Sequence, residues 1–170
     1  YNEMAKIIKD VANQSKNGTA STFTGTEFAY PVPGYTIITT SFGEVYNLVD
    51  PAGSAHTGTD IAGGDINGTP IYAIQDGVII TSGYSNYWYG NYVIINHGEC
   101  VDNNSSYISL YGHCSALVAK EGEKVKKGDL IGYVGTTGNS TGPHLHLEVR
   151  ENGERIDPLS LYPSMSFTIL

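Results

Sequence analysis

The chain has 170 residues, of which 40% are hydrophobic, and a formal net charge of −8 from 9 basic and 17 acidic side chains. This length and apolar content suit one compact domain with its own core and argue against wholesale disorder. A negative chain has no electrostatic reason to bind nucleic acid or an anionic membrane surface, and no apolar run approaches the roughly 20 residues of a membrane span.

The first predicted element is a short helix over residues 1–18. Four apolar residues recur at the spacing of one helix face: Met4, Ile7, Ile8 and Val11. Asn17 and Gly18 then provide a stop. Because the chain begins at Tyr1 rather than Met, we interpret this helix as the remnant of an upstream region. Residues 19–27 are expected to be a small polar linker.

Short strands separated by Gly, Asn and Asp at turn positions fill the remainder of the chain. The predicted strands are Thr36–Thr40, Pro70–Ile74, Gly77–Ser82, Tyr92–Asn96, Tyr107–His113, Leu130–Val134 and His144–Val149. No convincing helix follows residue 18. We therefore predict a mainly β domain built on antiparallel strands over residues 28–162, followed by a C-terminal tail over residues 163–170.

Two cysteines, Cys100 and Cys114, permit one disulfide but do not require it. Residues 92–97 and 106–114 are expected to pair as a hairpin centred near residue 102, which leaves Cys114 far from Cys100. Free thiols are therefore the favoured state.

Five histidines carry the strongest chemical signal, and the first lies in the segment His56-Thr-Gly-Thr-Asp60. If this segment is extended, positions 56, 58 and 60 share one face, and Gly58 adds no bulk between the two polar side chains. An imidazole and a carboxylate can then converge on one point. Taken alone, the pair is more often an exposed histidine beside a turn aspartate.

Two further histidines lie close together in the segment 143–147, PHLHL. Strand alternation places His144 and His146 on one face, while Leu145 and Leu147 point into the core. Two imidazoles on an otherwise apolar strand are costly as mere packing, because buried polar groups need partners. A metal or a polar reaction centre explains them better, although His-x-His also occurs by chance.

The fourth histidine, His113, ends the segment Leu110-Tyr111-Gly112-His113, in which Tyr111 and His113 are expected to share one strand face. A single strand histidine is usually just a hydrogen-bonded residue, so the interest of His113 comes from the combination. The fifth, His97, lies in an Asn-His-Gly turn at a strand end and is expected to be structural.

Two histidines and one carboxylate form a common catalytic zinc site, in which three protein ligands leave a fourth position open for water. Nitrogen and oxygen donors without a thiolate fit zinc best, although other divalent ions can occupy such sites. Zinc lowers the pKa of a bound water to about 7, and a nearby histidine can act as general base or stabilise the oxyanion.

Three motifs in this order resemble those of lysostaphin-type (LytM-like) zinc metalloendopeptidases, a family of peptidoglycan hydrolases. They are His56-x-x-x-Asp60, Leu110–His113 and His144-x-His146. The sequences around these motifs also resemble those of the same family: HTGTDIA at 56–62, GNYVIINHG at 90–98, VKKGDLIG at 125–132 and GTTGNSTGPHLHLE at 135–148. The resemblance covers residues 28–162 and implies an antiparallel β-sheet or sandwich peptidase domain with an open groove.

The resemblance also implies roles for individual residues. His56, Asp60 and His146 would bind one Zn²⁺ per chain. His113 and His144 would be the catalytic pair, which orients or deprotonates the water and stabilises the tetrahedral intermediate.

Substrate recognition is less well defined. Tyr111 either lines a substrate groove or belongs to the core. The loop 98–106, the segment 47–55 and the aromatic stretch 84–89 (YSNYWY) depart from the plainer family pattern. Loops around the open end of such a fold shape the groove. The bond that is cut therefore stays open between a glycine-rich cross-bridge, a D-amino acid crosslink and a stem-peptide bond.

The function that the resemblance implies is hydrolysis of peptide bonds in bacterial peptidoglycan through a metal-activated water. Such an enzyme would act outside the cell or in the bacterial cell envelope, with a monomer as the favoured state. The alternative is a non-enzymatic relative that serves as a cell-wall-binding or regulatory domain, although the chain keeps every motif residue that an enzyme requires.

Glycine turns at 76–78 and 121–129 also resemble those of biotinyl or lipoyl carriers, but the exposed lysine that a carrier needs is not found at a hairpin tip.

Overall fold

The structure is a computed structural model, and it describes residues 22–44, 56–86, 89–138 and 140–170. The helix predicted over residues 1–18 lies outside these ranges. Across the described residues the chain is mainly β, as predicted, and its strands form one 12-stranded sheet. No helix in this part of the chain has the length and hydropathy needed to cross a membrane.

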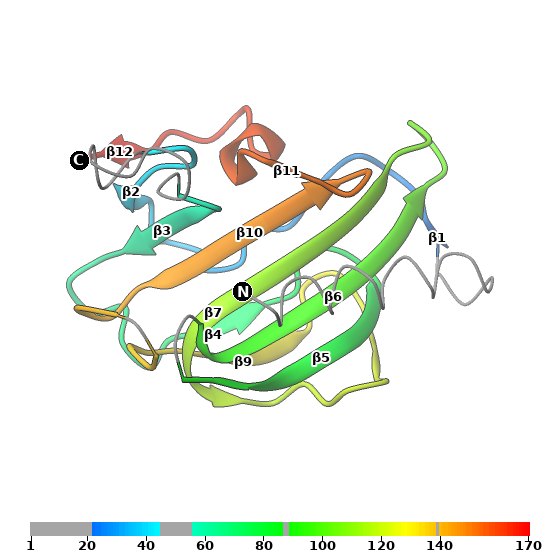
Figure 1. Ribbon diagram of the computed structural model, residues 1–170. Helices are drawn as coiled ribbons and strands as arrows, with labels where there is room; N and C mark the ends of the chain where they lie inside the picture. The colour runs from blue at the N-terminus through cyan, green and yellow to red at the C-terminus, as the bar shows by residue number, and fades with distance from the viewer. Residues whose placement is uncertain (1–21, 45–55, 87–88, 139) are drawn as a thin grey trace.

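The centre of the fold is a set of four long strands, each antiparallel to its neighbour (Figure 1). In spatial order they are β5 (Gly77–Ser85), β6 (Gly90–Cys100), β7 (Ser106–Leu117) and β10 (Leu145–Glu151). Beyond β10 the sheet continues through β3 (Thr59–Ala62), β2 (Ile37–Thr40) and β12 (Thr168–Ile169). The long strands are rich in β-branched and aromatic residues, which favour a pleated backbone. This order brings β3, β10 and β7 side by side.

The remaining strands are short. At the edges and ends of the main sheet lie β8 (Lys124–Val125), which pairs with β5, β11 (Glu154–Ile156), which pairs with β10, and β1 (Thr22–Phe23), which runs parallel to β6. β4 (Pro70–Tyr72) and β9 (Leu130–Val134) pair with each other, and β9 also pairs with the end of β7. The one helical element of the described residues is a 3-10 turn, η1 (Pro158–Leu161).

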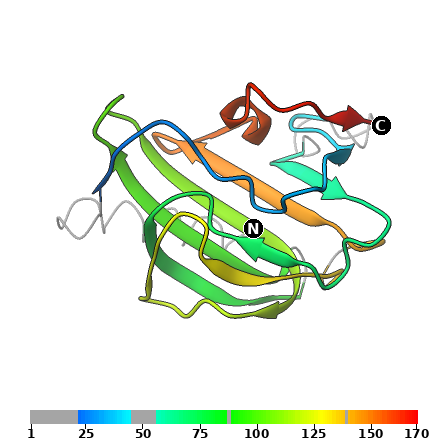
Figure 2. The same cartoon turned by 180° about the vertical axis from the view of Figure 1, so that it is seen from behind.

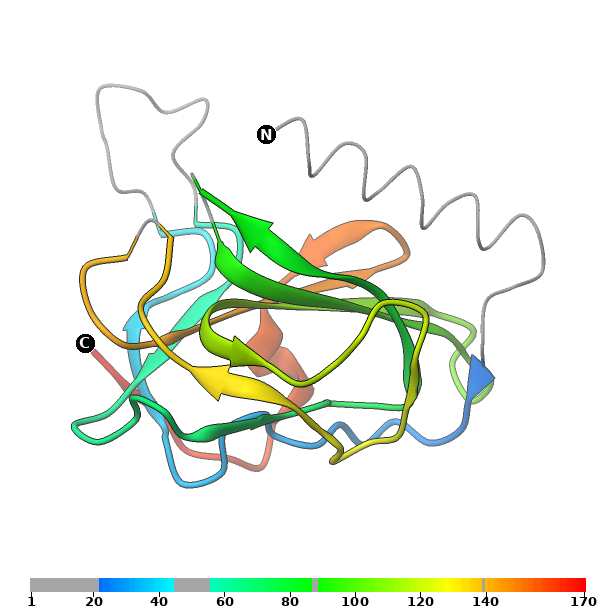
Figure 3. The ribbon, with the colours of Figure 1, turned by 90° about the horizontal axis from the view of Figure 1, so that it is seen from below.

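The main core lies between two layers. Figure 2 shows β4 and β9 in front of the main sheet, and Figure 3 shows both layers from below. Alternate residues of β10 point into this space, and Leu145 and Leu147 are fully buried there, as expected from strand alternation. Ile71 of β4 and Ile131 of β9 meet them from the second layer. Burial of each such side chain contributes about 2 kcal/mol.

The opposite face of the main sheet carries a smaller apolar cluster, formed by Ile80, Tyr92, Ile94 and Leu110. In the β7–β10 ladder Leu110 lies directly opposite Glu148, and Gly112 lies directly opposite His146. Directly paired residues of antiparallel strands point to the same face. His146 and Glu148 therefore belong to this second face and not to the main core.

The predicted strands are all present, and all but one have altered bounds. β9 spans Leu130–Val134 as predicted, whereas β5, β6 and β7 run longer and β4 is shorter. The strands β1, β3, β8, β11 and β12 were not among the predicted strands. Each has only two to four residues, which is too few for alternation to show in the sequence.

Residues from the expected linker and the expected tail pack against the folded domain. Phe23, in the expected linker 19–27, is 3% exposed and packs in the main core. In the expected tail 163–170, Phe167 packs against the same core and Thr168–Ile169 forms β12 beside β2. Phe23, Phe167 and β12 pack against strands that are distant in the sequence, and local sequence patterns do not report such contacts.

Cys100 and Cys114 are free and buried, as favoured from the sequence. The register of β6 and β7 places Asn91 opposite Cys114, at the far end of β6 from Cys100. Burial raises the pKa of the Cys114 thiol to about 12, so this side chain behaves as core packing.

Candidate active site

Two separate segments deliver one carboxylate and two imidazoles to a single point. The register of β3 and β10 places Asp60 directly opposite His146, and His56 lies just before β3. His146 Nδ1 is 2.8 Å from Asp60 Oδ1, and His56 Nε2 is 3.2 Å from the same oxygen. One candidate ligand atom from each residue lies within 4.8 Å of the other two. The strand order thus unites residues that are 86 positions apart.

The other ring nitrogen of each imidazole has a partner of its own. His56 Nδ1 is 3.1 Å from the carbonyl oxygen of Ser41, which can only accept, so this nitrogen carries the proton and Nε2 is left as the donor to a metal. His146 Nε2 is 3.0 Å from Glu148 Oε1, which leaves Nδ1 for the metal. Two oriented imidazoles and one carboxylate are the donor set of catalytic zinc sites, so the residues present fit zinc.

Electrostatics favour a cation at this point. Burial disfavours the ionised form of Asp60, but hydrogen bonds from His146 and His56 outweigh it and hold the pKa of this carboxyl well below its ordinary value. Burial likewise disfavours the charged form of His146, yet Asp60 and Glu148 raise its pKa to about 9. An imidazole between two carboxylates is an environment in which a divalent cation can replace a proton.

The other two site histidines lie beside this group. His144 Nε2 is 3.7 Å from Asp60 Oδ1, and the ring centroids of His113 and His144 are 4.7 Å apart. His113 Nδ1 is 2.7 Å from the carbonyl oxygen of Thr137, and His144 Nδ1 is 2.8 Å from that of Gly142. These carbonyls place the proton on Nδ1 in both rings and leave each Nε2 without a proton, so that it can act as an acceptor. Burial, opposed by the Thr137 hydrogen bond, lowers the pKa of His113 to about 4, so this ring is neutral at pH 7.

A local distortion of β7 allows His113 to reach the site. Its φ is 62°, a left-handed conformation that side chains other than glycine seldom adopt. The ladder between β6 and β7 shifts register between Asn91 and Val93, and the backbone N–H of His113 donates to the carbonyl of Tyr89 at 2.6 Å. The bulge takes His113 out of the alternation of the strand.

The expectation that Tyr111 shares a face with His113 was wrong. Tyr111 is fully buried in the main core, and its hydroxyl accepts hydrogen bonds from Ser109 Oγ at 2.7 Å and from the N–H of Ile74 at 3.1 Å. Tyr111 pairs with Leu147 of β10, which also points into the core. Tyr111 therefore does not line a substrate groove, because the bulge separates its direction from that of His113.

His97 belongs to the interior. It is fully buried, with Nδ1 2.8 Å from the carbonyl oxygen of Asp76 and Nε2 2.7 Å from Ser109 Oγ. Burial lowers the pKa of His97 to about 4, so the ring is neutral at pH 7.

Sequence reasoning did not single out Glu148, Thr57 or Tyr89. Glu148 is only 2% exposed, and its Oε1 accepts hydrogen bonds from Thr57 Oγ1 at 2.5 Å and from the Tyr89 hydroxyl at 2.6 Å. One signal could have found it. Glu148 stands two residues after His146 on the same strand face, where a buried acid needs a partner.

Glycines of two motifs make room for this arrangement. A Cβ on Gly58 would collide with the carbonyl oxygen of Leu147, so the approach of this segment to β10 requires glycine. A Cβ on Gly112 would lie 3.3 Å from Tyr89 Cδ1 and 3.4 Å from His146 Cβ. Gly112 thus leaves space for the Tyr89 ring beside His146.

Comparisons with known proteins identify related peptidases. The chain is 42% identical over 127 residues to the DD-carboxypeptidase/endopeptidase Mpg of Neisseria meningitidis, covering 75% of this chain and 27% of that protein. It is 45% identical over 104 residues to the peptidoglycan DD-endopeptidase ShyC of Vibrio cholerae, covering 61% of this chain and 22% of that protein. The chain thus spans about a quarter of the length of these relatives.

Solved structures show the same fold. A zinc-containing peptidase from Vibrio cholerae matches with a TM-score of 0.65 and 37% identity, over 75% of this chain and 37% of that one. The catalytic domain of lysostaphin from Staphylococcus simulans matches with a TM-score of 0.61 and 31% identity, over 74% of this chain and 90% of that one. The model of peptidase family M23 matches residues 54–158, which is more than half of the chain and includes all the site residues named above except Ser41. The chain therefore belongs to peptidase family M23.

Proposed function

We propose that the chain is a zinc metalloendopeptidase that hydrolyses peptide bonds in bacterial peptidoglycan. The observation that carries the proposal is the convergence of His56, Asp60 and His146 beside two further histidines whose Nδ1 atoms donate to backbone carbonyls. The relatives named above support the reaction and the substrate class, because one is a DD-carboxypeptidase/endopeptidase and another a peptidoglycan DD-endopeptidase. The zinc-containing peptidase supports the choice of metal.

The proposed roles follow from the donor and acceptor atoms. His56 Nε2, Asp60 Oδ1 and His146 Nδ1 would hold the zinc. Bound there, zinc supplies the Lewis acidity that activates a water and polarises the scissile carbonyl. His113 and His144 keep their protons on Nδ1, so each Nε2 can accept a proton. Once protonated, the same atom can donate to a developing oxyanion or return the proton to the leaving amine.

The low pKa of His113 affects its proposed role as a base. A neutral ring at pH 7 is available as a base throughout the physiological range, although a base of low pKa transfers protons with less driving force. Its Nδ1 bond to Thr137 fixes the direction of Nε2 before substrate arrives. One chain supplies all five side chains, so a monomer suffices for the reaction.

Peptidoglycan lies outside the cytoplasmic membrane, so the proposal places the action of this chain in the bacterial cell envelope or outside the cell. The decisive experiment measures zinc content by mass spectrometry and hydrolysis of purified peptidoglycan before and after chelation. We expect about one zinc per chain, with cleavage abolished by the chelator and restored by zinc. A zinc-loaded chain that cleaves neither whole peptidoglycan nor its isolated peptides would favour the non-enzymatic alternative.

A further inference from the structure

Glu148 is a buried carboxylate that neither the metal set nor the catalytic pair uses. It lies on β10 two residues after His146 and is 2% exposed. A buried carboxylate without partners is costly, so its position calls for interactions that offset the loss of water.

The hydrogen bonds that the described residues make to this carboxylate converge on one of its oxygens. Oε1 lies 3.0 Å from His146 Nε2, 2.5 Å from Thr57 Oγ1 and 2.6 Å from the Tyr89 hydroxyl. Since a carboxylate can only accept, each of the three groups donates its proton to Oε1. The three donors come from the segment before β3, from the loop before β6 and from β10 itself, so Glu148 ties three parts of the site together.

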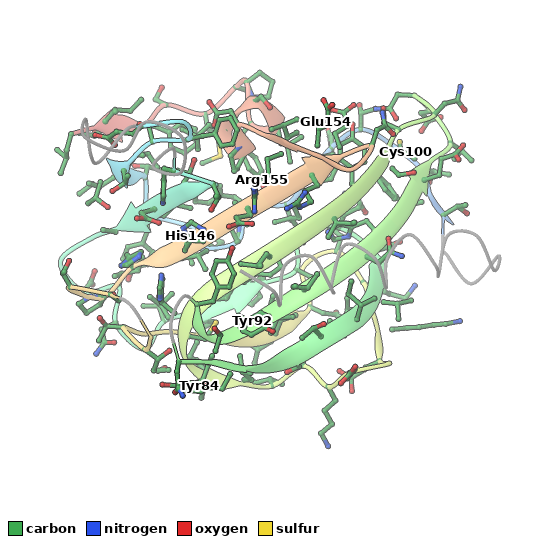
Figure 4. The ribbon with its side chains drawn as sticks, in the orientation of Figure 1. Tyr84, Tyr92, Cys100, His146, Glu154 and Arg155 are labelled. Carbon is green, nitrogen blue, oxygen red and sulfur yellow. The ribbon has the colours of Figure 1, made fainter. Side chains whose placement is uncertain are left out.

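The second oxygen, Oε2, is buried and has no hydrogen-bond partner among the described residues. Arg155 Nε lies 3.7 Å from this oxygen. Figure 4 shows Arg155 beside β10, on the same side of the sheet as His146. Arg155 compensates the charge of Glu148 without competing for the oxygen that faces His146.

Tyr89 extends this network to the catalytic pair. Its hydroxyl donates to Glu148, its ring lies 5.6 Å from the His146 ring, and its backbone carbonyl accepts the N–H of His113. One residue thus contacts both a proposed metal ligand and a proposed catalytic histidine.

We propose that Glu148 is a positioning residue for the metal site. By accepting the Nε2 proton of His146 it fixes the tautomer and the ring orientation in which Nδ1 faces Asp60. Thr57 and Tyr89 hold the carboxylate in the position that this requires. The inference rests on the zinc peptidase function proposed above and adds three residues to it.

Zinc affinity of the full 170-residue chain, measured by competition with a chromophoric chelator, tests the proposal directly. We expect Glu148→Gln to bind zinc about ten- to a hundredfold more weakly than the wild type, the range seen when such supporting partners are removed. Tyr89→Phe, which removes one donor and leaves the carboxylate, should lose less. The matched control is Glu154→Gln, the same chemical change at an exposed position of β11, which should leave affinity unchanged.

Cobalt(II) substitution provides a second measurement, which would not change if the role of Glu148 were purely structural. The visible absorption bands of the cobalt-loaded chain report ligand geometry, and we expect Glu148→Gln to shift them while Glu154→Gln does not. A folded Glu148→Gln chain with wild-type zinc affinity and a wild-type cobalt spectrum overturns the proposal. If Glu148→Gln does not fold, Tyr89→Phe and Thr57→Val replace it, and wild-type affinity and spectra in both of these overturn it.

The outcomes separate this inference from the proposed function. A wild-type chain that binds no zinc overturns both. A wild-type chain that binds zinc and cleaves peptidoglycan, together with unaffected Glu148 variants, overturns the positioning role alone.

Discussion

Acid should destabilise the fold through one buried histidine, His97. Its imidazole is fully buried between the carbonyl of Asp76 and the hydroxyl of Ser109. Burial lowers the pKa of His97 from 6.5 to about 4 in the folded chain. The unfolded chain therefore binds more protons than the folded chain between pH 6.5 and about 4, and the free energy of unfolding must fall as the pH falls through this window.

The magnitude follows from the two pKa values. A change of one pKa unit corresponds to about 1.4 kcal/mol, so full protonation of His97 removes about 3 kcal/mol of stability. The contribution is fully present above pH 6.5 and is lost by about pH 4. A loss of this size is a large share of the roughly 5–15 kcal/mol by which single domains are stable.

Urea denaturation of metal-free protein at several pH values between 7 and 4 measures the effect. Other groups titrate in the same range, so the comparison is with His97→Gln, which keeps a neutral hydrogen-bonding side chain that cannot be protonated. This variant will be less stable at pH 7, yet the difference from the wild type should shrink by about 3 kcal/mol as the pH falls to about 4. Parallel pH profiles of the two proteins would refute the assignment of a depressed pKa to His97.

Four further outcomes are expected. His56→Ala should lose zinc and hydrolysis together, and a variant that keeps either in full would contradict its role as a ligand. His113→Ala should keep zinc but hydrolyse peptidoglycan about a hundredfold or more slowly, as measured by release of soluble fragments; unchanged turnover would remove it from the catalytic pair. Leu147→Ala, in the main core, should cost about 2–5 kcal/mol in chemical denaturation, and a loss below 1 kcal/mol would contradict its full burial. Gly58→Ala should impair zinc binding, because its Cβ meets Leu147 O and lies 2.9 Å from Glu148 Cγ; wild-type affinity would show that β3 can shift at no cost.

The alternation of polar and apolar residues in His144–Leu147 shows how far local sequence determines this site. It places Leu145 and Leu147 in the core and leaves His146 on the other face, and the structure agrees. The donor set of the metal site could also be predicted from the sequence, because imidazole and carboxylate side chains without thiolates are typical of catalytic zinc sites. The mainly β architecture followed from the same periodicity together with the turn residues.

Other features depended on contacts between distant segments. The bulge that separates Tyr111 from His113 arises where β7 meets β6, and alternation within one strand cannot reveal a register shift against another. The ladders of β3, β7 and β10 decide that Asp60 and Gly112 both lie opposite His146. Without these pairings the motifs are only three segments with suitable chemistry.

The network around Glu148 shows most clearly which features follow from local sequence and which follow from tertiary contacts. Residue spacing alone predicts that the acid two positions after His146 lies on the same strand face. The convergence of Thr57 and Tyr89 on this acid depends on contacts between distant segments, because sheet order and close packing fix which hydrogen-bond partners meet. Residue types and periodicity therefore specify which chemistry is available, whereas three-dimensional pairing specifies which atoms act together.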